Sequence, residues 1–133
     1  TNSVTPSFTN IPGLAFPVNP GGTYHASCKI IWQATVALTA NPRYQWTGPN
    51  AATLTMFSSL VEPTNLTTFA TNIITTYGTT LSQTNNAGLA GKDFIDNIEL
   101  NLINGANTGT VQLQAGPVGA GTLTIEAGSN CIV

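Results

Sequence analysis

Charged side chains are scarce in this sequence. Lysine and arginine together number 3 and aspartate and glutamate 5, which is 6% of the 133 residues, against about 25% in an average soluble domain. The three basic residues, Lys29, Arg43 and Lys92, cannot form a positively charged stripe. Nucleic-acid binding through phosphates is therefore excluded as a function, because it needs clustered cations.

A surface with so few charges has two explanations. Partner subunits can cover part of it, or uncharged threonine, asparagine, serine and glutamine side chains can solvate it, and we expect both. The net charge of −2 causes little repulsion between copies of the chain. Close association of several copies is therefore tolerated.

Long apolar runs are also lacking. No run approaches the ~20 residues that a membrane-spanning helix needs, and no basic region followed by an apolar stretch opens the sequence. We therefore expect a soluble chain with no signal peptide and no membrane insertion. The two cysteines, Cys28 and Cys131, are too few for a disulfide scaffold.

Residues suited to catalysis or metal binding are few. His25 is the only histidine, no histidine, cysteine or carboxylate cluster has metal-site spacing, and no Gly-x-Ser-x-Gly motif marks a hydrolase. Asp93, Asp96 and Glu99 lie close in sequence, but on a strand Asp96 points away from the other two. A calcium site at Asp93 and Asp96 is the alternative to a solvated start of a strand. We predict that the protein is not an enzyme and needs no metal or cofactor.

The sequence does contain the pattern of an all-β domain. Its length fits one domain, residues 1–133, and its apolar fraction of 41% supports a core. Helix signals are poor, and even the best stretch, 65–77, is rich in threonine and isoleucine, which favour strands. Short alternating runs between glycine, proline and asparagine clusters predict an antiparallel β-sandwich. The predicted strands are 8–18, 23–35, 43–47, 53–60, 93–103, 109–115 and 121–127.

Alternation within these runs predicts which side chains face the core. Pro12-Gly13 marks 8–18 as an edge strand, and 61–91 is the least readable region, with one or two strands and a loop through 83–88. About eight strands fit a jelly roll better than an immunoglobulin-like sandwich. The expected inward residues are Tyr24, Ala26, Cys28, Ile30, Trp32, Ile98, Leu100, Leu102, Val111, Leu113, Leu123 and Ile125.

The order of five segments resembles a known family. The segments are FTNIPGLAFPV (8–18), GTYHASCKIIW (22–32), RYQWTGP (43–49), GTVQLQ (109–114) and GTLTIEAGSNCIV (121–133). In this order they resemble the trimeric head domains at the tips of bacteriophage tail fibres and of bacterial collagen-like surface fibres. Those heads are similar to the tumour-necrosis-factor and complement jelly rolls. The resemblance does not extend over 60–91, and Asn130-Cys131 stands where family members have a larger apolar or aromatic residue.

The resemblance implies a fold, an assembly and a role. The fold is a jelly roll like that of tumour necrosis factor, with eight to ten strands, and the assembly is a homotrimer about a threefold axis. The implied location is extracellular, on a virion surface as a tail fibre or spike, or on a bacterial cell surface. Loops would attach the head to a glycan or protein receptor of a host cell. The alternative is a structural trimerisation or capsid-decoration domain without a ligand.

The resemblance also implies a relation between the two cysteines. In the tumour-necrosis-factor topology the strand that holds Cys28 runs beside the final strand, which holds Cys131. Both would face the core as near neighbours, either bonded as a disulfide or buried as free thiols. We favour free thiols here, because phage proteins assemble in a reducing cytosol.

Arg43, Tyr44 and Trp46 are the candidate ligand-binding residues. They end a strand before a Gly-Pro turn, and an aromatic side chain beside an arginine at a loop can hold a sugar ring by stacking and hydrogen bonds. The alternative is that Tyr44 and Trp46, which share one parity, fill the core. We expect Trp32 and Phe94 in the core.

Overall fold

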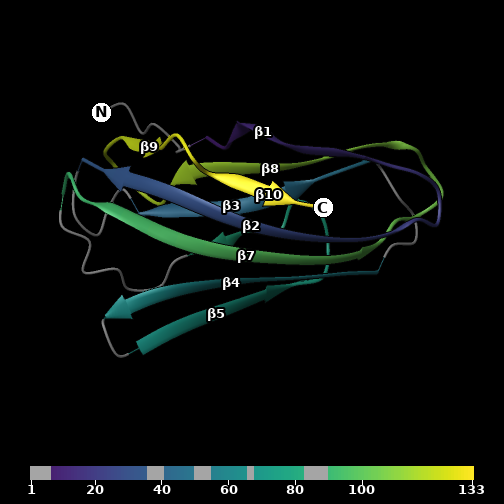
Figure 1. Ribbon diagram of the computed structural model, residues 1–133, viewed down its shortest axis with the longest axis horizontal. Coiled ribbons are helices and arrows are strands. Elements are labelled where there is room, and N and C mark those ends of the chain that lie inside the picture. Colours follow the sequence, from purple (N-terminus) through teal and green to yellow (C-terminus); the bar gives the residue numbers. More distant parts are fainter. Residues whose placement is uncertain (1–6, 36–40, 50–54, 66–67, 83–89) are drawn as a thin grey trace.

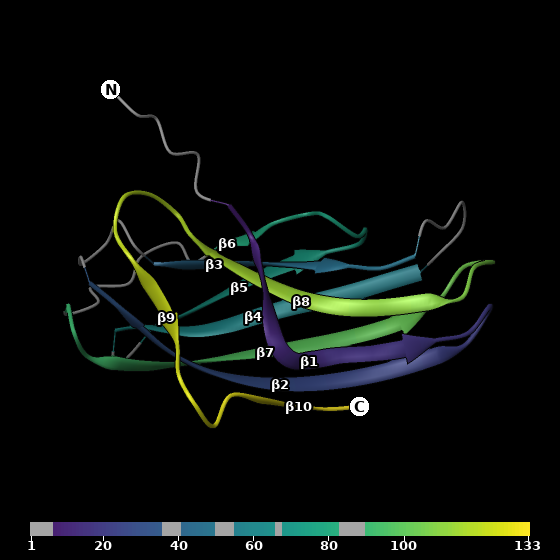
Figure 2. The same cartoon turned by 90° about the horizontal axis from the view of Figure 1, so that it is seen from above.

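The chain is built from strands. The computed structural model describes residues 7–35, 41–49, 55–65, 68–82 and 90–133, and Figures 1 and 2 present it from two directions. These residues contain no helix that could cross a bilayer, and the predicted all-β class is confirmed. The strands are β1 (Thr9–Val18), β2 (Thr23–Ala34), β3 (Pro42–Thr47), β4 (Thr55–Asn65), β5 (Thr68–Ile74), β6 (Leu81–Ser82), β7 (Asp93–Ile103), β8 (Gly109–Pro117), β9 (Leu123–Ile125) and β10 (Asn130–Ile132).

The strands form two antiparallel sheets that face each other (Figure 1). The four-stranded sheet has the order β1-β8-β3-β6, and the six-stranded sheet has the order β10-β2-β7-β4-β5, with β9 also paired to β2. Four pairings are nested in sequence: β1 with β8, β2 with β7, β3 with β6 and β4 with β5. The chain is therefore the antiparallel β-sandwich that its alternating pattern predicts.

The core lies between the two sheets and follows the predicted alternation. On β2, the side chains of Ala26, Cys28, Ile30 and Trp32 are buried. The prediction is also confirmed for β7 and β8, whereas the side chains of the short β9 are only partly buried against the core. A period of two is what a strand with one buried face requires. The buried side chains of β7 and β8 are those of Ile98, Leu100, Leu102, Val111, Leu113 and Ala115, together with Asp96.

The least readable part of the sequence forms two long strands. β4 continues to Asn65, five residues beyond the predicted end at Leu60, and β5 (Thr68–Ile74) lies within 65–77, the stretch with the best helical signal. β5 is a strand because its threonine and isoleucine side chains are restricted in a helix and fit a pleated sheet. The predicted loop through 83–88 lies outside the described residues.

β1 is an edge strand of the four-stranded sheet, as predicted. Its register against β8 shifts between Asn10 and Ala15, and Gly13 within that interval has a φ of 77°. Proline cannot donate to a ladder, and glycine adopts a positive φ without a steric penalty, so the irregularity sits at Pro12-Gly13.

Cys28 and Cys131 form a disulfide. They lie directly opposite each other where β10 pairs with β2, so the implied neighbourhood of the two cysteines is confirmed. The expectation of free thiols is wrong in this structure, because the register of β10 brings the two side chains together on the core side of the sheet. The residues that follow are exposed, with Ile132 at 74% and Val133 at 60% of their full surface.

A smaller apolar cluster adjoins the main core, and Leu123 and Ile125 pack against both. The rings of Trp32 and Phe94 stack with centroids 4.9 Å apart, and Ala34, Leu123 and Ile125 pack around them. Trp32 is fully buried, as predicted, while Phe94 is partly buried. Side chains of β2, β7 and β9 therefore pack together in this second cluster.

Candidate functional site

The three candidate ligand-binding residues divide between two faces of β3. Tyr44 and Trp46 point into the core and have no exposed surface, while Arg43 points outward with its guanidinium 4.6 Å from the ring centroid of Phe8. A sugar cannot stack on a ring that the core covers. The prediction that Tyr44 and Trp46 hold a ligand is therefore wrong, and the alternative of core filling holds.

The two buried aromatic residues instead join the sheets through hydrogen bonds. The Tyr44 hydroxyl donates to Asp96 Oδ2 at 2.7 Å, and Trp46 Nε1 donates to Ser58 Oγ at 2.8 Å. Ser58 in turn donates to the backbone oxygen of Glu99 at 2.8 Å. β3 is thus tied to β7 and β4 across the core, which satisfies polar atoms that burial would otherwise leave without a partner.

The outward face of the four-stranded sheet carries amide side chains. Gln45 Nε2 donates to Gln114 Oε1 at 2.6 Å, and Gln114 Nε2 donates to Asn10 Oδ1 at 2.7 Å. These three residues, here called the amide row, run across β3, β8 and β1. Arg43 and Phe8 lie near one end of this polar face, so Arg43 is the one candidate that remains on the surface.

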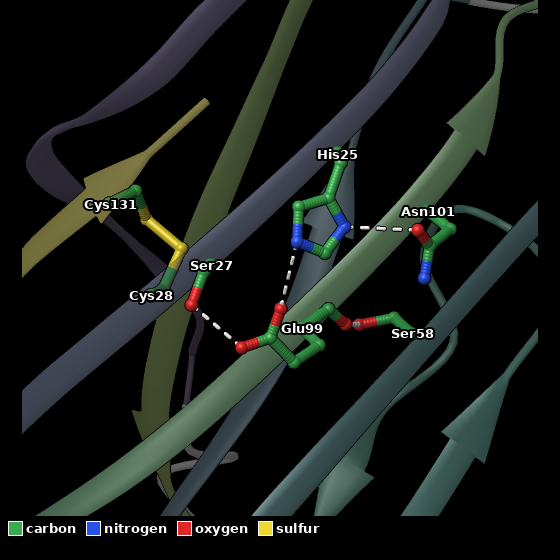
Figure 3. Close-up of polar contacts among 7 residues, drawn as sticks. All are labelled: His25, Ser27, Cys28, Ser58, Glu99, Asn101 and Cys131. Atoms are coloured by element: carbon green, nitrogen blue, oxygen red, sulfur yellow. Dashed lines mark hydrogen bonds and ion pairs between the residues drawn. A yellow bond between two sulfur atoms is a disulfide. The ribbon is translucent and has the colours of Figure 1, made fainter.

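A second polar group, the His25 network, lies on the outward face of the six-stranded sheet (Figure 3). His25 Nδ1 is 2.9 Å from Asn101 Oδ1, and His25 Nε2 is 3.3 Å from Glu99 Oε2. Ser27 Oγ donates to Glu99 Oε1 at 2.6 Å. The four residues come from β2 and β7, where His25 faces Asn101 and Ser27 faces Glu99 in the register.

The His25 network does not have the connectivity of a hydrolytic triad. Ser27 donates its proton to the carboxylate of Glu99, whereas a triad needs the serine hydroxyl to donate to the histidine. His25 instead contacts Asn101 and Glu99 through its two ring nitrogens. The network thus holds two strands together on the surface, and its serine hydroxyl is hydrogen-bonded to the carboxylate and not to the histidine.

The acidic residues of β7 do not converge, as the strand geometry predicts. Asp96 is buried and accepts the hydrogen bond from Tyr44, while Asp93 is exposed and accepts from Gln33 Nε2 at 3.3 Å. Asp96 is therefore not part of a solvated start of a strand. In the described part of the chain, no group of three or more histidine, cysteine or acidic residues could hold a metal ion.

Sequence reasoning missed a set of exposed apolar side chains on the face that carries the His25 network. Most of them follow or precede an inward apolar residue, as in Met56-Phe57, Ile73-Ile74 and Leu102-Ile103. Such doublets break the strict alternation of a strand with one wet face. They are the signal by which this surface could have been predicted. Its members are Phe57, Ile73, Ile95, Ile103 and Ile132, here called the apolar face.

Comparison with protein-family models, curated proteins and solved structures finds no match to this chain. The resemblance to fibre head domains therefore remains a prediction from the residues. The function has to be argued from the fold and from the surfaces described above.

Burial raises the pKa of Tyr77 from 10.0 to about 12. Tyr77 packs against Gly48, where an added Cβ would lie 2.4 Å from the ring. The folded protein keeps the phenol proton at a pH where the unfolded chain loses it. This group therefore contributes stability that is complete below pH 10 and is lost as the pH rises to about 12.

We expect Tyr77→Phe to remove this part of the alkaline loss of stability. Urea unfolding at intervals between pH 8 and pH 12 should give a flatter curve for the variant than for the wild type. At pH 8 the variant should be at least as stable as the wild type, because the Tyr77 hydroxyl is buried with no hydrogen-bond partner in the described residues and its removal relieves a desolvation cost. Parallel curves over the whole range would contradict the assignment.

Proposed function

We propose that this chain is a non-enzymatic jelly-roll head domain that associates as a homotrimer on the surface of a virion fibre or of a bacterial cell. The nested strand pairing carries the proposal. A jelly roll is a hairpin of four strand pairs wrapped into two sheets, and pairs β1–β8, β2–β7, β3–β6 and β4–β5 fit that description. The strands β9 and β10 then extend the sheet beside β2.

The scarcity of charge supports the trimer. A trimer buries part of each subunit, and the buried centres of interfaces are depleted in charged residues. Only 6% of this chain is charged. Of these charges, Asp96 is in the core and Glu99 is held in the His25 network, so few remain on the surface to oppose association.

A structural role without a ligand is the second candidate, and the position of the aromatic residues favours it. A sugar-binding site would use the rings of Tyr44 and Trp46, but both are in the core. The trimerisation or capsid-decoration function needs no such site. Attachment to a glycan or protein receptor stays a prediction that a glycan array can test, with Arg43→Ala as the variant that should lose binding.

Sedimentation equilibrium tests the assembly. At micromolar concentration the particle should have three times the 13.8 kDa mass of one chain, because a closed cyclic assembly removes apolar and uncharged surface from water. The measurement is repeated at low and high salt. A particle of 13.8 kDa at every concentration would rule out the proposed assembly.

A further inference from the structure

The outward face of the six-stranded sheet is unusually apolar for a surface. Among the side chains that the structure describes, which exclude those of 60–72, seven large apolar ones are exposed, and five of them lie on this face. Monomeric proteins expose apolar side chains singly, and a group of them on one face marks an interaction surface. The most exposed are Ile132 at 74%, Ile73 at 56% and Phe57 at 49% of their full surface.

Strand register places three of these side chains in the same rows as the His25 network. Asn101 of β7 faces His25 of β2 on one side and Phe57 of β4 on the other. The next row on this face, which passes through Glu99, reaches Ile73 on β5 and Ile132 on β10. Polar and apolar groups thus form one continuous surface across five strands.

The remaining two apolar side chains lie along β7. Ile103 pairs with Thr23 near one end of the strand, and Ile95 pairs with Ile31 toward the other. Along the strands, the apolar face therefore extends beyond the His25 network in both directions. Together the five side chains surround a polar centre.

The polar centre is already paired within the face. Both oxygens of the Glu99 carboxylate have a partner, since Oε1 accepts from Ser27 and Oε2 contacts His25. Asn101 Oδ1 contacts the other ring nitrogen of His25. Covering a charge costs least when its hydrogen bonds are already made, so a partner can lie over this face without leaving an unpaired carboxylate.

The outward face of the four-stranded sheet has the opposite character. Its described strand residues include the amide row and Arg43, and none of the exposed large apolar side chains lies on them. Water can solvate amides and hydroxyls, so the described polar side chains of that face require no covering partner. The two outward faces of the sandwich are therefore chemically distinct.

We propose that a second copy of this chain covers the apolar face. The proposal rests on the self-association proposed above and names the surface that carries it. From Thr23 to Gln33 the face is about 34 Å long, and with strands ~4.8 Å apart its area is on the order of 700 Å². A stable interface uses about 800 Å² from each partner, which is close to the area of this face. In a closed trimer each interface joins two different surfaces, so the apolar face is one side of the interface and another surface of the next copy is the other.

The charges of the face favour a partner of the same composition. On the described side chains of β2 and β7, the ionisable groups of this face besides the paired His25 and Glu99 are Lys29 and Asp93, one of each sign. A strongly charged partner would meet no complementary charge here, whereas a weakly charged surface of a second copy matches this face. The long side chain of Lys29 can lie along an apolar neighbour with its ammonium group at the rim.

Charge insertion on the two outward faces tests the proposal. The double substitution Phe57→Lys with Ile73→Lys should weaken association at least about 100-fold, because it buries unpaired ammonium groups in the interface. Ile132→Lys, at the most exposed position, should act in the same direction with the least risk to the fold. Thr110→Lys adds the same charge to the outward face of β8 and should associate as the wild type does.

Sedimentation velocity over a range of concentrations measures how tightly each variant and the wild type associate. Near-ultraviolet circular dichroism from the buried Trp32 and Trp46 reports that each variant is folded. Apolar-face variants that assemble as tightly as the wild type overturn this inference and leave the proposed trimer intact. Loss of assembly in Thr110→Lys alone places the interface on the opposite sheet and also overturns it. A monomeric wild type removes both proposals.

Discussion

Replacement of both Cys28 and Cys131 with alanine should lower the free energy of unfolding by about 4 to 5 kcal/mol. The disulfide spans 103 residues of sequence, and in the chain-entropy account a closed loop of about 100 residues stabilises the folded state by that amount, because it restricts the unfolded chain. Urea unfolding of the variant and of the oxidised wild type measures the difference.

The reduced wild type is the matched control for this experiment. It has the same side chains without the cross-link, so in the presence of a reducing agent it should unfold close to the double variant. Reduction should also free β10, whose described pairing with β2 covers only Asn130, Cys131 and Ile132. A difference below about 1 kcal/mol between oxidised and reduced protein would contradict a stabilising role for the bond.

Trp46→Ala should destabilise the fold by about 4 kcal/mol, the usual range for removing a fully buried aromatic ring. Trp46 is fully buried, and its ring packs against Phe16 with centroids 6.4 Å apart. The substitution leaves a cavity, and it also removes the Nε1 donor from the buried Ser58 hydroxyl. Chemical unfolding monitored by circular dichroism measures the loss.

Trp46→Phe separates the ring from its hydrogen bond. This variant keeps most of the apolar volume and removes the donor to Ser58, so it should cost about 1 to 3 kcal/mol. A sugar-binding role would predict the reverse: little loss of stability from Trp46→Ala and a loss of ligand affinity. Equal stability of Trp46→Ala and the wild type would contradict the core assignment.

The fold class could be predicted because its signal is local. Alternation along Thr23–Ala34 and Asp93–Ile103 specifies one buried face for each strand, whatever the rest of the chain does. The extent of β4 and the existence of β5 could not be derived so firmly. Their side-chain pattern is also compatible with a helix. They form strands because β4 pairs with β7 and β5 pairs with β4.

The candidate site was harder to predict, because parity along a strand does not say which face is inside. Tyr44 and Trp46 share a parity whether they bind a sugar or fill the core, and only the packing of the six-stranded sheet against that face of β3 shows that they fill the core. The His25 network depends on the register of β2 against β7, which joins residues more than 70 positions apart in sequence. No local pattern contains that register.

The cysteines also show one property that could be predicted from the sequence and one that could not. The neighbourhood of Cys28 and Cys131 followed from the expected order of strands, whereas the choice between thiol and disulfide was made from the expected cellular compartment. The structure has a disulfide and not two free thiols, because Cys28 and Cys131 are directly opposite each other in adjacent strands. A cross-strand pair on one face brings Cβ atoms within bonding reach.

The position of the disulfide determines what a protease can release from the domain. Cys28 lies on β2 and Cys131 on β10, so every loop between those two strands falls inside one covalent ring. A single cut in any such loop leaves both pieces attached to each other, and the paired sheets can keep their places around the break. A domain exposed outside a cell would in this way survive a nick that would separate an open chain.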